Sequence, residues 1–151
     1  MALKDSLSRY KPAVVRSKLF ILAGVLWSVA GVILFQFSIR WLLAIEVQQE
    51  IILALAGLLL AAVFYRWGFR SIVKKNIARL HTLPERPCVF AFASVRSYLL
   101  IAVMMTMGIM LRNSSIPKYD LAVPYEAMGG ALFLGSLQYF LSWRALILHK
   151  D

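Results

Sequence analysis

Arg96 is the residue of this sequence whose type and position most clearly suggest chemistry. If the apolar stretch from about Phe90 to Leu111 forms a helix, Arg96 lies about two turns inside it. A charge at that depth in a membrane costs at least about 3 kcal/mol unless it is paired or reaches the interface. Arg96 therefore either binds an anionic lipid headgroup or an anionic substrate, or its long side chain snorkels to the polar interface.

Three other polar residues extend this candidate site. Gln138, in the last apolar stretch, is expected at a depth similar to that of Arg96 and is a candidate partner for it. Arg66 and Arg70 belong to the same run of cations that ends at Arg96. Lys and Arg clustered beside a membrane span attract anionic headgroups. We therefore predict a substrate or headgroup site made of Arg96, Gln138, Arg66 and Arg70.

Glu126 is the one acidic residue within an apolar stretch, and it suggests a second site. Glu126 comes directly after Pro124 and Tyr125. We therefore expect a helix to begin at Pro124, with the Glu126 carboxylate in its first turn. The helix dipole favours a negative charge at that position. Arg112 is expected nearby, across a short loop, as its ion-pair partner. The alternative is that Glu126 binds a proton or a cation in an outward-facing vestibule.

The sequence offers few residues that could bind a metal ion or a cofactor. The thioethers of Met104, Met107 and Met110 suit Cu(I), but methionine also fills gaps in cores. The single cysteine and both histidines fall outside the apolar stretches. The sequence contains no GxSxG, HExxH or Walker motif. We therefore expect no metal site, no cofactor and no catalytic residue, and predict that the protein is not an enzyme.

Four long apolar stretches must position these side chains. Hydrophobic residues make up 61% of the chain and its mean hydropathy is +0.74, whereas soluble domains are about 45–50% apolar. Each stretch approaches the ~20 residues that cross a bilayer, and only helices satisfy the backbone there. We predict an all-α polytopic membrane protein whose single transmembrane domain, residues 1–151, is a four-helix antiparallel bundle. Its spans are expected at about 19–41, 51–69, 90–111 and 121–143.

Lys and Arg are divided unevenly between the connections. Of the 17 in the chain, 14 lie in the two terminal segments or around the second connection, and only Arg40, Arg112 and Lys118 lie on the other side. The positive-inside rule places the richer side in the cytoplasm. We therefore expect both termini to be cytoplasmic, in the plasma (inner) membrane of a bacterium or archaeon.

The second connection is predicted to contain a further helix. Val73, Ile77 and Leu80 recur at helical spacing with cations between them. The second span is therefore expected to continue into a short cytoplasmic amphipathic helix. The segment 83–87, which contains two prolines, should end this helix before the third span.

Small residues recur along three of the stretches. In lipid, such residues allow helices to approach closely, so we predict that they form contacts within one bundle, with dimerisation as the alternative. Trp27, in the middle of the first span, is expected to pack against another helix. The predicted contact residues are Gly24, Ser28, Gly31, Gly57, Ala61, Ala127, Gly129, Gly130, Ala131 and Gly135.

Three functional classes fit these features. The net charge is +10, and because the cations border the spans we expect them to meet anionic lipid rather than nucleic acid. The first class, favoured by the few polar groups in the spans, is an accessory or structural subunit of a membrane complex. The second is a small transporter or channel acting as a homo-oligomer. The third is a membrane protein that binds anionic lipid.

Overall fold

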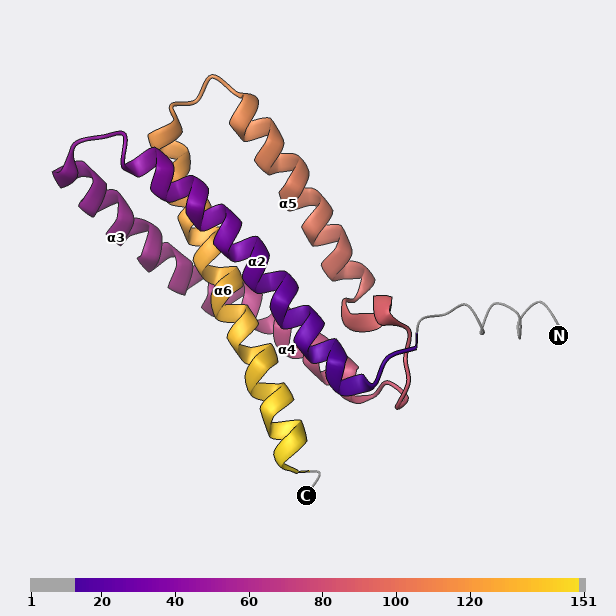
Figure 1. Cartoon of the computed structure of the whole chain (residues 1–151). Helices are drawn as coiled ribbons and strands as arrows, with labels where there is room; N and C mark the ends of the chain where they lie inside the picture. The colour runs from indigo at the N-terminus through magenta and orange to yellow at the C-terminus, as the bar shows by residue number, and fades with distance from the viewer. Residues whose placement is uncertain (1–12, 150–151) are drawn as a thin grey trace.

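The computed structural model describes residues 13–149, and every long element in that range is a helix (Figure 1). An isolated β-bridge joins Ala13 to Cys88. Two short elements interrupt the α-helices: η1 is a π-helical turn and η2 a 3-10 turn. In chain order the elements are α2 (Arg16–Leu42), α3 (Val47–Phe64), η1 (Tyr65–Phe69), α4 (Arg70–His81), η2 (Val89–Phe92), α5 (Val95–Asn113) and α6 (Lys118–Leu148).

Four helical segments are long and apolar enough to cross a membrane. They are α2, the continuous helix Val47–His81 that joins α3, η1 and α4, then α5 and α6, with 27, 35, 19 and 31 residues. A rise of about 1.5 Å per residue lets ~20 residues cross ~30 Å of hydrocarbon. The prediction of an all-helical protein with four helices long and apolar enough to span a membrane is therefore confirmed.

Two helix starts differ from those predicted. α5 begins at Val95 rather than near Phe90, because the side chain of Ser94 accepts a hydrogen bond from the Ser97 amide and caps the helix there. α6 begins at Lys118, and Pro124 lies inside it. Pro124 lies beyond the first turn, so it removes the hydrogen bond to the Asp120 carbonyl, and the helix nevertheless continues through this position.

The most extensive helix contact joins α2 and α6, which cross in Figure 1. A Cβ atom added at Gly31 would lie 2.8 Å from the carbonyl oxygen of Gly129, and the reverse distance is the same. Further along, the Trp27 ring covers Gly135 and meets the Phe69 ring edge-on, with centroids 5.8 Å apart. The predicted close approach of small residues and the packing of Trp27 are confirmed at these positions.

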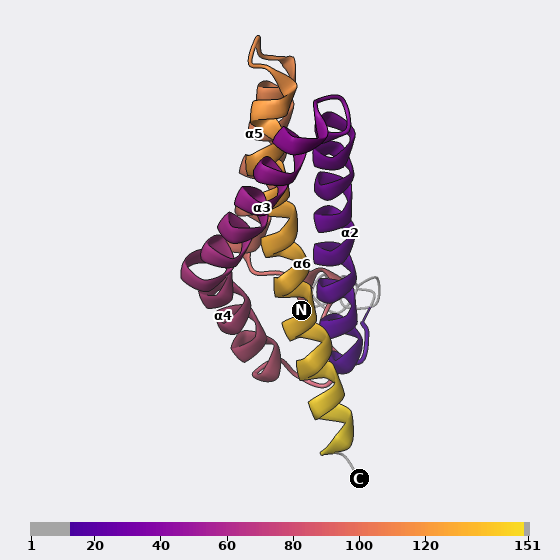
Figure 2. The same ribbon diagram turned by 90° about the vertical axis from the view of Figure 1, so that its left-hand side faces the viewer.

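α3 packs on another side of α6, again through small residues. A Cβ at Gly130 would lie 2.7 Å from that of Ala61, and a Cβ at Gly57 would meet the Glu126 carboxyl. Below this contact the helix passes through η1 into α4, whose Val73 and Leu80 are fully buried against α2 and α6. Figure 2 shows the change of direction between α3 and α4. The apolar face of α4 is thus covered by protein.

α5 is the spanning helix with the least packing. Figure 1 shows it standing apart from α2 and α6. Ser97, in its first turn, is the one buried residue of this helix. Its exposed side chains include Leu99, Val103 and Met110. A space therefore separates α5 from α4.

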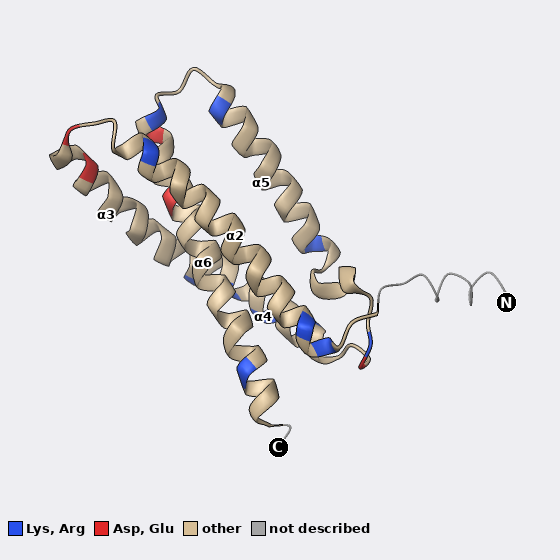
Figure 3. Cartoon of the chain, in the orientation of Figure 1, with Lys and Arg blue, Asp and Glu red and all other residues tan. Residues whose placement is uncertain are grey.

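Charged residues collect at the two ends of the molecule (Figure 3). Most of the described cations lie at the end where α2 begins and α4 ends, which we call the basic end. Arg16, Lys18 and Arg144 belong to it. Glu46, Glu50 and Asp120 lie at the opposite end.

Candidate functional site

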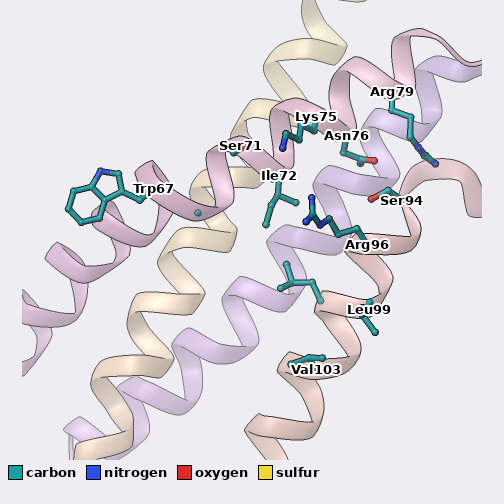
Figure 4. Close-up of a pocket in the computed structure, with 12 residues that line it drawn as sticks. Trp67, Ser71, Ile72, Lys75, Asn76, Arg79, Ser94, Arg96, Leu99 and Val103 are labelled. Atoms are coloured by element: carbon teal, nitrogen blue, oxygen red, sulfur yellow. The ribbon is translucent and has the colours of Figure 1, made fainter.

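A cavity of about 680 Å³ lies between α5 and the η1–α4 segment; we call it the α4–α5 groove (Figure 4). Its lining changes character along its length. Nearer the basic end, the polar lining is Lys75, Asn76, Arg79, Ser94 and Arg96, while the polar Ser71 lies between Gly68 and Ile72. The apolar lining is Trp67, Gly68, Ile72, Leu99, Leu100 and Val103.

The local sequence shapes both walls of the groove. The π-helical turn η1 contains Gly68, where an added Cβ would meet no atom within 4 Å, and Trp67, whose side chain is 80% exposed. Such turns occur often at functional sites. On the other wall, the Ser94 cap places Arg96 in the first turn of α5. Arg96 is therefore in the first turn of its helix and not two turns inside it, as predicted, and it lines the groove at its polar end.

Two exposed cations stand on opposite walls. Lys75 projects from α4, and Figure 4 shows the Arg96 guanidinium projecting from α5 toward α4. None of the described residues that line the groove is acidic. An anionic group between these two side chains would gain charge-assisted hydrogen bonds, which are stronger than neutral ones.

Arg79 adds a third cation but is already engaged. Its guanidinium donates hydrogen bonds to the Ala91 carbonyl at 2.9 and 3.2 Å and to the Ala93 carbonyl at 3.3 Å. These bonds tie α4 to the segment that precedes α5. Arg79 therefore sets the position of the second wall while its charge adds to the positive character of the groove.

Asn76 lies at the inner side of the groove and joins three elements. Its side chain is 3% exposed, and Nδ2 donates to the Phe92 carbonyl and to the Tyr139 hydroxyl, both at 2.9 Å. Tyr139 is itself fully buried on α6. The other amide atom, Oδ1, is buried without a hydrogen-bond partner. Buried polar atoms in native structures are nearly always paired, so this one requires an explanation.

The structure separates the four residues predicted for this site. Gln138 lines a different cavity, with Lys74 and His81, on another face of α4. Arg66 is exposed and Arg70 half-buried, and neither lines the groove. Of the predicted set, only Arg96 is in the groove.

Sequence reasoning missed Lys75, Asn76, Arg79 and Ser94. One signal could have revealed Asn76: it interrupts the apolar stripe of Val73, Ile77 and Leu80 with an amide. A polar residue on an otherwise buried helix face must find polar partners. The cations beside it carry no such signal, because charged residues are ordinary on the exposed face of a helix.

Arg112 and Glu126 are also kept apart within the described part of the chain. The Arg112 guanidinium carbon lies 4.8 Å from the Phe37 ring centroid, and Nε donates to the Gly108 carbonyl. Glu126 is 4% exposed, rests against Gly57 of α3, and its Oε2 has no hydrogen-bond partner. Because α6 begins at Lys118, Glu126 lies beyond its first turn, and the proposed helix-dipole role is wrong.

The methionines of α5 do not converge on a common point. Met107 and Met110 are exposed, whereas Met104 packs against the core. Among residues 13–149, no group of three or more His, Cys, Asp or Glu is placed to hold a metal ion.

Comparison of the chain with protein-family models, with curated proteins and with solved structures finds no match. The geometry of the groove is therefore the basis for a functional proposal.

Proposed function

We propose that this integral membrane protein binds an anionic lipid, with the phosphate of its headgroup held in the α4–α5 groove. The observation that carries the proposal is the order of the lining. Lys75 and Arg96 lie nearer the basic end, and Leu99 and Val103 follow along α5 toward its middle. This order matches an amphiphile with a negative head and an apolar chain.

The charge distribution supports a matching orientation in the membrane. We propose that the spans form an antiparallel bundle, that the basic end with both termini faces the cytoplasm, and that α4 is a cytoplasmic helix at the membrane surface. The unequal division of Lys and Arg supports this topology, in the plasma membrane of a bacterium or archaeon. The groove would then lie among the headgroups of the cytoplasmic leaflet, where anionic lipids create a negative surface potential.

The other two functional classes stay predictions. An accessory subunit would act through a partner protein, and a transporter or channel would act as a homo-oligomer. The groove favours the lipid-binding class because it joins cations to an apolar wall within a single copy of the chain.

The test compares lipid retained by matched arginine variants. The purified protein is released gently from the membrane, supplied with phosphatidylglycerol, and its bound lipid is counted by native mass spectrometry. We expect Arg96→Gln to lower the affinity about tenfold, because a charge-assisted hydrogen bond is lost. Arg144→Gln is the control, since Arg144 is an exposed cation of the basic end that does not line the groove. Equal losses in the two variants, or equal retention of zwitterionic phosphatidylcholine, would contradict the proposal.

A further inference from the structure

The geometry of Asn76 points to a specific kind of headgroup. We propose that the lipid bound in the α4–α5 groove has a free hydroxyl group beyond its phosphate, and that Asn76 Oδ1 accepts a hydrogen bond from it. The ligand class is thus a phosphate diester with a polyol headgroup. This inference rests on the proposed function, because it assumes that the groove holds an anionic lipid.

The orientation of the Asn76 amide is determined by its partners. The Phe92 carbonyl can only accept, so the amide atom 2.9 Å from it must be the donor Nδ2. The second hydrogen of Nδ2 goes to the Tyr139 hydroxyl. Rotating the amide by half a turn would place two acceptors together at Phe92, which excludes the alternative assignment. Oδ1 is therefore a hydrogen-bond acceptor that lacks a donor.

The groove beside Asn76 is where a donor for Oδ1 would be held. The described protein supplies none, since Oδ1 is buried without a partner, and Asn76 lines this cavity. Figure 4 shows the Asn76 oxygen on the side that faces Ser94 and the start of α5. The Ser94 hydroxyl is already engaged with the amide and hydroxyl of Ser97. A buried acceptor left unpaired destabilises the site, so a ligand that pairs it gains affinity.

The charges of the groove limit what that donor can be. An ionised phosphate diester only accepts hydrogen bonds, so the phosphate itself cannot satisfy Oδ1. An ammonium group beyond the phosphate would be repelled by Lys75, Arg79 and Arg96, because a single phosphate only partly offsets three cations and no acidic residue is among the described lining. A hydroxyl group donates without a charge. The combination that fits is a phosphate for the cations and an alcohol for Asn76.

The experiment compares two lipids that differ only in headgroup hydroxyls. Phosphatidylglycerol and phosphatidylpropanol, with the same acyl chains, have the same charge and the same number of headgroup carbons. Their binding to the full-length wild-type protein is titrated by native mass spectrometry, with phosphatidylcholine as the reference. We expect phosphatidylglycerol to bind about fivefold more tightly than phosphatidylpropanol, the effect of one neutral hydrogen bond.

Two variants then test whether the headgroup hydroxyl of the lipid binds at Asn76 Oδ1. Asn76→Leu removes Oδ1, and we expect the two anionic lipids to bind it equally. Tyr139→Phe removes a neighbouring hydroxyl but leaves Oδ1, so the preference for phosphatidylglycerol should remain. If Asn76→Leu does not fold, the wild-type comparison of the two lipids still decides.

The outcomes separate the two proposals. Equal binding of both anionic lipids by the wild-type protein, above phosphatidylcholine, overturns the hydroxyl inference and leaves anionic-lipid binding intact; water then pairs Oδ1. A preference for phosphatidylglycerol that survives in Asn76→Leu also overturns it. Binding of neither anionic lipid above phosphatidylcholine overturns the proposed function itself.

Discussion

The contact between α2 and α6 and the groove between α4 and α5 are opposite ways of placing two helices together. At the first, Gly31 and Gly129 bring the backbones so close that an added Cβ would lie 2.8 Å from the facing carbonyl. At the second, a cavity of about 680 Å³ lies between the helices. One contact excludes every ligand, and the other leaves space for one.

The difference follows from the residues on the facing surfaces. Glycines have no side chain to keep helices apart, and in lipid close backbone packing is a main source of helix association. The groove instead presents Lys75 and Arg96 from opposite walls. Like charges resist closure unless an anion lies between them. The cavity in this fold lies where two helices present charges of the same sign.

The largest effect is expected from filling the tight contact. Gly129→Leu places a side chain where a Cβ already meets the Gly31 carbonyl, so α2 and α6 must separate. We expect it to lower the free energy of unfolding by about 3 kcal/mol, at the upper end of the usual cost of overpacking, measured by thermal unfolding in detergent. Gly68→Ala is the control, because an added Cβ there meets nothing within 4 Å. Equal destabilisation by both variants would show that the α2–α6 contact is not tight.

The second prediction concerns a substitution that should close the groove. Arg96→Glu places an anion opposite Lys75, so we expect the walls to attract each other. Binding of phosphatidylglycerol should fall more than tenfold, further than in Arg96→Gln, because the site then also repels the phosphate. Titration of the two variants by native mass spectrometry measures the difference. If Arg96→Glu binds this lipid as well as Arg96→Gln does, the charge at position 96 does not determine the affinity of the groove for an anionic lipid.

The smallest effect concerns a pair that the structure keeps apart. Arg112 lies over the Phe37 ring, whereas Glu126 rests against Gly57. A double-mutant cycle with Arg112→Gln and Glu126→Gln should therefore show a coupling energy below about 0.5 kcal/mol, as for residues without direct contact. The measurement is thermal unfolding of the wild type, both single variants and the double variant. A coupling energy of about 1 kcal/mol or more would restore the ion pair predicted from the sequence.

Predictions from the sequence succeeded for the candidate site only in part. Arg96 was identified because a cation inside a long apolar stretch is unusual. Its predicted position two turns inside the helix was wrong, because the Ser94 cap starts α5 at Val95, and hydropathy does not register that local hydrogen bond. Gln138 was a wrong partner because equal depth does not place two residues on facing sides. Asn76 was missed because its importance depends on Phe92 and Tyr139, which are distant in the sequence.

The sequence by itself determined the four spanning segments and the uneven division of charge. Both depend on how residues are ordered along the chain, since a long apolar stretch must satisfy its backbone as a helix in lipid. Only the tertiary structure decided which side chains share a cavity. That depends on the rotation of each helix about its axis and on which helices adjoin. The glycine contacts of α6 hold α2 and α3 in place, and η1 and the Ser94 cap then bring Lys75, Asn76 and Arg96 to one groove.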